Sequence, residues 1–192
     1  MATNIEIEVK VLLSKADFRK VEVAMNADHY EKVSQTNYYI DTGVDGQLRR
    51  YGISLRVREL DKQLQLNLKT PLAEAILEKT QDLTSVQFKK MQKENVFPRG
   101  HIYEFVESLG IDMDKLQILA SLETIRTSFN YKGYKFSLDT NYYDNIKDYE
   151  LEMQGSSLGK AEELLREICE LADVPFVINN RSKQARAIAQ SA

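Results

Sequence analysis

Charged residues alternate with apolar residues along most segments of this chain that have strand-like sequences. In the first, residues 5–11, Ile5, Ile7 and Val9 fall on one face of an extended strand, and Glu6 and Glu8 fall on the other. The charged faces of these segments together carry Glu6, Glu8, Lys10, Arg56, Arg58, Lys69, Glu78, Arg126, Asp139, Glu150 and Glu152. Charged residues recur in nearly every strand-like segment while the opposite faces are apolar, so this pattern constrains the fold more than any other feature.

Two periodicities divide the chain into strands and helices. Alternation predicts strands at residues 5–11, 37–41, 48–59, 64–69, 75–80, 116–131, 132–140 and 147–153. Residues 116–131 and 132–140 are expected to form a hairpin around a Lys132-Gly133 turn. Helical spacing of apolar residues predicts helices at residues 14–25, 84–94, 102–109, 158–172 and from Ser182 onward. Ser14 is a candidate helix N-cap, Thr84 with Gln87 has the spacing of a capping box, and residues 41–46 have the composition of a turn.

The opposite faces of these strands need different surroundings. If the helices pack on the apolar faces, the charged faces line an interior, which stays folded only when it is wet or when ions compensate its charges. This arrangement is an inside-out barrel. Charged strand faces also occur on ordinary sheets that turn one face to water, so the alternation alone leaves both interpretations open.

The charged residues themselves indicate the ligand that such an interior would bind. Glu6 and Glu8 lie two residues apart on one strand face, so both carboxylates can converge on a hard divalent cation. Arginine and lysine side chains, such as the pair Arg56 and Arg58, suit phosphate oxygens. Carboxylates would repel a nucleic acid, so the combination favours a polyphosphate chelated to a divalent metal.

Composition sets the general class of protein. The 192 residues include 43% hydrophobic and 29% charged residues with only 3 Pro, which predicts one globular domain over residues 1–192. The net charge of −3 excludes a global attraction to nucleic acid or anionic membranes. No run of eighteen apolar residues and no signal peptide is evident, so we expect a cytoplasmic protein. The single cysteine, Cys169, is expected to be a buried apolar residue.

The order and spacing of these residues match a known family. The relevant segments are Glu6-Ile7-Glu8-Val9-Lys10, Tyr39 with Asp41, Leu55-Arg56-Val57-Arg58, Leu68-Lys69, Glu78, Thr124-Ile125-Arg126, Leu138-Asp139, Tyr149-Glu150-Leu151-Glu152, and Ser182-Lys183 with Arg186. In this order the chain resembles the CYTH superfamily, also called triphosphate tunnel metalloenzymes. The resemblance implies an α+β fold in which helices surround an eight-stranded antiparallel β-barrel, or tunnel. It also implies a Mg²⁺ or Mn²⁺ cofactor and the hydrolysis or cyclisation of a triphosphate.

The resemblance assigns roles to the charged residues. The implied metal ligands are Glu6, Glu8, Glu78, Asp139, Glu150 and Glu152. The implied phosphate-binding residues are Lys10, Arg56, Arg58, Lys69, Arg126 and Lys183, with Arg186 as either a further member or a structural partner. We expect Lys10, Glu150 and Glu152 to be catalytic, with a carboxylate of the last strand orienting the attacking water.

Several activities remain open at this level. Inorganic triphosphate is the leading substrate and thiamine triphosphate follows closely. An adenylyl cyclase on the same fold is less favoured, because no residue of the sequence is evidently required for a nucleobase pocket. A non-catalytic nucleotide or polyanion binder is the third alternative, since Tyr38, Tyr39, Tyr142 and Tyr143 could stack on bases. We expect a small-molecule triphosphate as the partner, with no stable nucleic-acid partner and no membrane, and a homodimer is left open.

Overall fold

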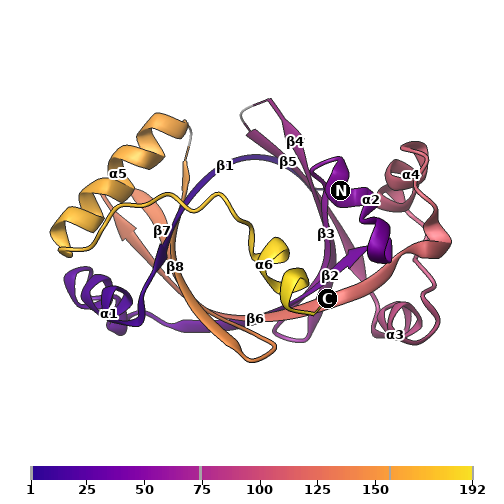
Figure 1. The fold of residues 1–192 in the computed structure, drawn as a ribbon, viewed down its shortest axis with the longest axis horizontal. Helices are drawn as coiled ribbons and strands as arrows, with labels where there is room; N and C mark the ends of the chain where they lie inside the picture. The colour runs from indigo at the N-terminus through magenta and orange to yellow at the C-terminus, as the bar shows by residue number, and fades with distance from the viewer. Residues whose placement is uncertain (1, 74, 156, 192) are drawn as a thin grey trace. The chain divides into compact units, whose positions relative to one another are not determined.

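The computed structural model describes residues 2–73, 75–155 and 157–191, and the side chains of residues 2–6 and 44 lie outside this description. Its strands are β1 (Ala2–Leu13), β2 (Lys32–Asp41), β3 (Ser54–Leu60), β4 (Gln63–Leu72), β5 (Ala75–Leu83), β6 (Gln117–Tyr131), β7 (Tyr134–Tyr143) and β8 (Ile146–Gly155). Hydrogen bonds join these strands in the order β1-β5-β4-β3-β2-β6-β7-β8 and close the sheet into a barrel. The predicted α+β fold with an eight-stranded antiparallel barrel is therefore confirmed (Figure 1).

Short helices connect the strands. They are α1 (Lys15–Ala24), α2 (Gln47–Arg50), α3 (Ser85–Glu94), α4 (His101–Ser108), α5 (Leu158–Leu171) and α6 (Lys183–Gln190), with single 3₁₀ turns η1 (Ala27–His29), η2 (Gly43–Asp45) and η3 (Met113–Lys115). In the described part of the chain, none of them has the length and apolar character that crossing a membrane requires.

The predicted end signals of the helices and strands are confirmed. The Ser14 hydroxyl accepts a hydrogen bond from the Asp17 backbone N–H at 3.1 Å, which begins α1. Thr84 and Gln87 form the reciprocal capping box at the start of α3. Lys132 and Gly133 both have positive φ angles, 50° and 80°, which a two-residue hairpin turn requires between β6 and β7.

One strand prediction is wrong at its beginning. Residues 48–59 were expected to be extended, but α2 covers Gln47–Arg50 and β3 begins only at Ser54. The cause is the buried carboxylate of Asp41, which accepts hydrogen bonds from the backbone N–H groups of Thr42 and Leu48 at 2.8 and 2.9 Å. The bond from Leu48 satisfies one of the first amides of α2, and the bond from Thr42 stabilises the turn before it.

The chain divides into two compact units, and each is described by itself. Unit 1 comprises residues 1–5, 36–122 and 184–192, and unit 2 comprises residues 6–35 and 123–183. In unit 1 the apolar faces of β3 and β4, which include Leu55, Val57 and Leu66, pack in one cluster with Phe88 of α3 and Ile102 of α4. The helices of this unit therefore cover the apolar face of its strands, as the sequence predicts.

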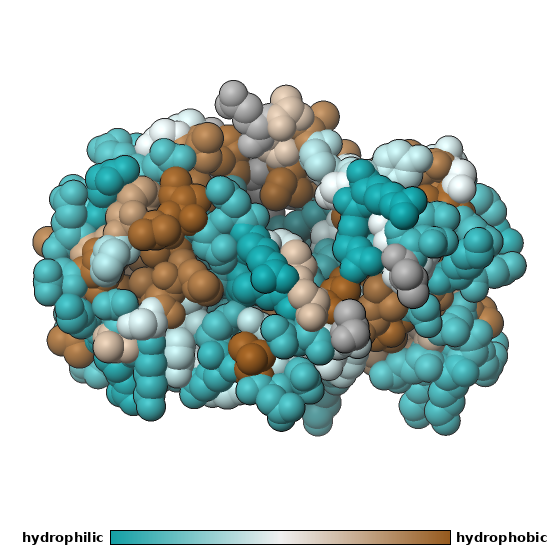
Figure 2. All heavy atoms as spheres, viewed as in Figure 1, coloured by the Kyte–Doolittle hydropathy of each residue, from teal (hydrophilic) through white to brown (hydrophobic). Residues whose placement is uncertain are grey.

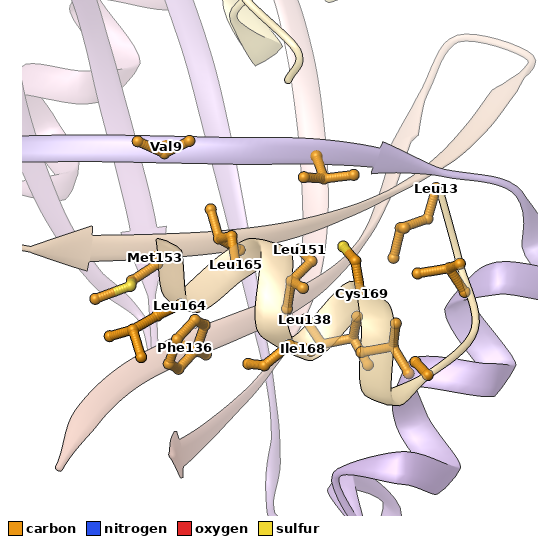
Figure 3. Close-up of a cluster of buried hydrophobic side chains, with 14 of the residues drawn as sticks. Val9, Leu13, Phe136, Leu138, Leu151, Met153, Leu164, Leu165, Ile168 and Cys169 are labelled. Carbon is orange, nitrogen blue, oxygen red and sulfur yellow. The ribbon is translucent and has the colours of Figure 1, made fainter. Parts of the chain in front are cut away.

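Unit 2 repeats this arrangement with different elements. Leu138 of β7 and Leu151 of β8 pack against Leu165 and Ile168 of α5, and Figure 3 shows these side chains gathered between strands and helix. Burial of each large apolar side chain contributes about 1.5–3 kcal/mol to stability. Cys169 lies in this cluster as predicted, and its burial raises the pKa of the thiol to about 11.

Some apolar side chains remain exposed outside both clusters. Val23, Val86 and Val177 are each more than 60% exposed. Figure 2 shows hydrophobic residues in groups among the hydrophilic residues on one face. Since more than half of an ordinary protein surface is apolar, these residues alone do not indicate a binding surface.

Candidate functional site

The register of unit 2 places charged residues side by side on one face of its sheet. Arg126 of β6 lies opposite Asp139 of β7, and Asp139 lies opposite Glu150 of β8. Lys10 of β1 lies opposite Glu152 of β8. Because neighbours along a strand point to opposite faces, Leu138, Leu151 and the other core residues lie on the reverse face, against α5. The alternation of the sequence thus separates this charged face from the helix-covered core.

Arg126 joins two acidic residues from neighbouring strands. Its guanidinium donates to both carboxylate oxygens of Asp139, at 2.7 Å from Nε and 2.6 Å from Nη2. The same Nη2 lies 2.6 Å from Oε2 of Glu152. A bidentate geometry of this kind fixes the orientation of both partners.

Lys183, the first residue of α6, contacts three carboxylates of unit 2. Its ammonium group lies 2.8 Å from Oδ2 of Asp139 and 3.1 Å from Oε2 of Glu150. It also donates a short hydrogen bond to Oε1 of Glu152. The three acids therefore converge on one positive charge.

Burial makes these contacts strong. Asp139 and Glu150 are 0% exposed, and Glu152 is 6% exposed. Burial alone would raise the pKa of Glu152, but Lys183, Arg126 and Lys10 together hold it well below its usual range. Burial would likewise lower the pKa of Lys183, but Glu152, Asp139 and Glu150 raise it well above its usual range. Both groups are therefore charged at neutral pH.

The β1 residues extend the same charged face. The Lys10 ammonium donates to Oε1 of Glu8 at 3.0 Å. Burial lowers the pKa of Lys10, but Glu8 and Glu152 outweigh this effect and raise it. Glu6 belongs to β1, and its side chain lies outside the described part of the structure.

Unit 1 carries a second group of predicted site residues. Lys69 lies opposite Glu78 in the register of β4 and β5, and Nη2 of Arg56 lies 3.7 Å from Oε1 of Glu78. Arg58 donates to the amide oxygen of Asn37 at 3.2 Å. These residues share the strand face opposite the core of unit 1, because Leu55, Val57 and Leu68 lie on the other face.

The predicted site residues are therefore grouped within each unit. Unit 2 brings together Glu8, Lys10, Arg126, Asp139, Glu150, Glu152 and Lys183. Unit 1 brings together Arg56 and Glu78. Arg186 belongs to unit 1 and is only 6% exposed, on α6.

The donor chemistry fits a hard divalent cation, although the side chains are engaged in ion pairs. Carboxylate oxygens are the ligands that Mg²⁺ and Mn²⁺ prefer, and three carboxylates already converge on the Lys183 ammonium. Among the described residues, no group of three or more His, Cys, Asp or Glu side chains is arranged as a metal site. A metal would therefore compete with Lys183 and Arg126 for these oxygens.

Uncharged polar residues of this face were not predicted from the sequence. Asn141 donates to Oε2 of Glu150 at 3.1 Å, and Asn179 donates to Oε1 of Glu150 at 3.2 Å. Asn141 lies two residues from Asp139 on the same strand face, so the alternation could have identified it. Asn179 follows α5 in a segment without periodicity, and no sequence signal marks it.

Three of the four tyrosines considered as base-stacking residues are buried or packed against another ring. Tyr39 is 1% exposed and Tyr143 is 7% exposed, so neither presents a ring face to a base. Tyr38 packs against Phe88, with ring centroids 4.9 Å apart. These positions weaken the alternative of a nucleotide-stacking module.

The sequence and the fold of this chain are similar to those of known proteins. The chain is 28% identical over 175 residues to "Putative triphosphatase YjbK" of Bacillus subtilis (strain 168), covering 91% of this chain and 90% of that protein. It is 30% identical to a structure described as a "putative adenylate cyclase" from Bacillus halodurans, with a TM-score of 0.88 and coverage of 97% and 98% of the two chains.

A more distant structure shares the fold. It is the "Putative adenylyl cyclase HpAC1 from Hippeastrum", which is described as having a dominant triphosphatase activity. The identity is 20%, the TM-score is 0.77, and the match covers 97% of this chain and 95% of that one. The CYTH domain matches residues 4–181, nearly the whole chain. This protein therefore belongs to the CYTH domain family.

Proposed function

We propose that this protein is a metal-dependent triphosphatase whose substrate is a compact triphosphate, with inorganic triphosphate as the leading candidate. The observation that carries the proposal is the convergence of three buried carboxylates, those of Asp139, Glu150 and Glu152, on one cation, Lys183. Buried carboxylates are costly unless cations compensate them, and charged groups whose pKa values are strongly shifted in this way gather at functional sites more often than elsewhere. The similarity to a protein named as a triphosphatase supports this activity.

The acidic residues would bind the metal ion, and the basic residues would bind the phosphate groups. The carboxylates of Glu8, Asp139, Glu150 and Glu152 would hold Mg²⁺ or Mn²⁺, together with Glu6 and Glu78 as proposed further ligands. A bound divalent ion neutralises phosphate charge and acidifies a water molecule. The cations proposed to bind phosphate oxygens are Lys10, Arg56, Arg58, Lys69, Arg126, Lys183 and Arg186.

Hydrolysis of a triphosphate depends mainly on charged groups held in the correct positions. A phosphoryl group passes through a loose transition state with charge spread over its oxygens, so cations held in place in advance supply most of the stabilisation. The bidentate contact of Arg126 to Asp139 supports this proposal, because it fixes the orientation of the guanidinium group. One carboxylate of β8, Glu150 or Glu152, would orient the attacking water.

One comparison favours a second candidate function. The 30% identical structure is described as a putative adenylate cyclase, so cyclisation of ATP is the alternative reaction. A single domain over residues 1–192 and a cytoplasmic location stay predictions from the sequence, and the choice between a monomer and a homodimer stays open.

The identity of the product distinguishes these activities. Phosphate release is measured from inorganic triphosphate, thiamine triphosphate and ATP in parallel, each with Mg²⁺, Mn²⁺ or a chelator, and cyclic AMP is assayed in the ATP reactions. The proposal predicts fastest turnover of inorganic triphosphate and none with the chelator. Cyclic AMP without phosphate release from any substrate would instead establish the cyclase.

A further inference from the structure

Both carboxylate oxygens of Glu150 accept a hydrogen bond from a neutral amide. Asn179 donates to Oε1 at 3.2 Å, and Asn141 donates to Oε2 at 3.1 Å. Glu150 is 0% exposed, so these amides act where water does not compete. Two donors on opposite oxygens restrict rotation of the carboxylate.

Asn141 is itself held by its neighbours on unit 2. Its amide oxygen accepts from the Thr124 hydroxyl at 2.8 Å, and its amide nitrogen also donates to Oδ1 of Asp148 at 2.9 Å. The other oxygen of Asp148 accepts from the Tyr143 hydroxyl at 2.6 Å. With its oxygen and nitrogen both bonded, Asn141 presents its amide to Glu150 in one orientation.

Asn179 is held in place by the segment between α5 and α6. Its backbone N–H donates to the carbonyl of Lys10 at 2.8 Å, and its side-chain oxygen accepts from the backbone N–H of Arg181 at 3.0 Å. The preceding residue, Ile178, pairs with Val11 of β1. Asn179 is therefore fixed to β1 while its amide reaches across to Glu150 on β8.

The charge of these donors distinguishes them from Lys183, which also contacts Glu150. A divalent cation near this carboxylate repels an ammonium group strongly, but it does not repel a neutral amide in the same way. The two amides can therefore keep Glu150 in one orientation whether its charge is balanced by Lys183 or by a metal. Partners of this kind commonly orient metal ligands.

We propose that Asn141 and Asn179 are positioning residues that orient the Glu150 carboxylate toward a divalent metal ion. The proposal rests on the proposed function, because it takes Glu150 as a metal ligand. Asn179 is the sharper test, since it is partly exposed, whereas Asn141 is fully buried and its replacement can unfold the protein.

The experiment titrates Mn²⁺ into substrate-free protein by calorimetry and measures kcat and KM with inorganic triphosphate. The variants are Asn179→Ala, Asn141→Ala and Glu150→Gln, and the matched control is Asn180→Ala, which replaces the neighbouring exposed asparagine. We expect Asn179→Ala to weaken Mn²⁺ binding by about 10-fold or more. We also expect kcat to fall while KM changes little, with an unfolding midpoint in chelator close to that of the wild type. The control should match the wild type throughout.

The outcomes separate this inference from the proposed function. If Glu150→Gln loses Mn²⁺ affinity but Asn179→Ala binds and turns over like the wild type, the positioning role is wrong and the metal site stands. A variant of Asn179 that no longer folds would also overturn the positioning role, because the contact would then be structural. If the wild type and Glu150→Gln bind Mn²⁺ equally, or if neither binds it, Glu150 is not a metal ligand. The proposed function is then contradicted at this residue, whatever the result for Asn179→Ala.

Discussion

The ammonium group of Lys183 lies 2.8 Å from the carboxylate of Asp139, although 44 positions separate the two residues in the sequence. This contact joins the first residue of α6 to the charged face of β7 and β8. Because Asp139 is fully buried, its charge needs compensation, and Lys183 supplies part of it beside Arg126.

Replacing Lys183 should therefore destabilise the protein. Lys183→Met leaves Asp139, Glu150 and Glu152 with one fewer cation in a buried site, and breaking such a group costs about 3–5 kcal/mol. Urea unfolding in chelator measures the loss. The exposed Lys135→Met is the matched control and should change stability little. Equal stability of the two variants would contradict the ion-pair account.

The depressed pKa of Glu152 predicts a pH dependence with a definite sign. The folded pKa lies below the ordinary value of 4.5, so the charged carboxylate stabilises the fold above pH 4.5. This contribution is lost progressively as the pH falls below that value toward the folded pKa. The difference in the free energy of unfolding between the wild type and Glu152→Gln, measured with urea in chelator, gives the contribution of this carboxylate to stability. The two proteins should differ most near pH 7 and converge on acidification, and a constant difference would refute the prediction.

The core of unit 2 should respond to loss of volume. Leu151 is 0% exposed and packs in the cluster formed with α5, so Leu151→Ala should lower the free energy of unfolding by about 2–5 kcal/mol. Leu171 ends α5 and is 57% exposed. Leu171→Ala is therefore the control, with a change of about 0.5 kcal/mol or less. Similar losses in both variants would show that the cluster does not stabilise the sheet.

The proposed phosphate-binding residues should affect both substrate binding and rate. Arg58→Ala removes a cation that would contact phosphate in the ground state and in the transition state, so KM should rise and kcat should fall. A charged hydrogen bond is worth about 1.5–3 kcal/mol, so kcat/KM should fall by roughly 10- to 100-fold. The exposed Arg50→Ala should leave both constants unchanged. Unaltered kinetics in Arg58→Ala would exclude it from the site.

Local patterns predicted most of the fold. Alternation separated Glu150 and Glu152 from Leu151 correctly, because a strand points successive side chains to opposite faces. Capping signals such as Thr84 with Gln87 act within one helical turn, so the sequence contains them completely. The charged residues on the strand faces could also be predicted, because alternation along a strand is a local pattern that the sequence shows directly.

Contacts between distant segments could not be predicted in this way. A strand was predicted from residue 48 onward, but the carboxylate of Asp41 stabilises α2 there instead. Asn179 reaches Glu150 only because its segment is tied to β1. Neither contact follows a periodic pattern, since each depends on how separate elements meet.

The most direct test of the account is the initial rate of phosphate release from inorganic triphosphate with Mn²⁺ for the wild type, Glu8→Gln and Glu170→Gln. Glu8 pairs with Lys10 on the charged face, whereas Glu170 is exposed on α5. The account predicts turnover by the wild type and Glu170→Gln, and none by a folded Glu8→Gln or in chelator. Undiminished turnover by Glu8→Gln, or turnover that persists in chelator, would contradict it.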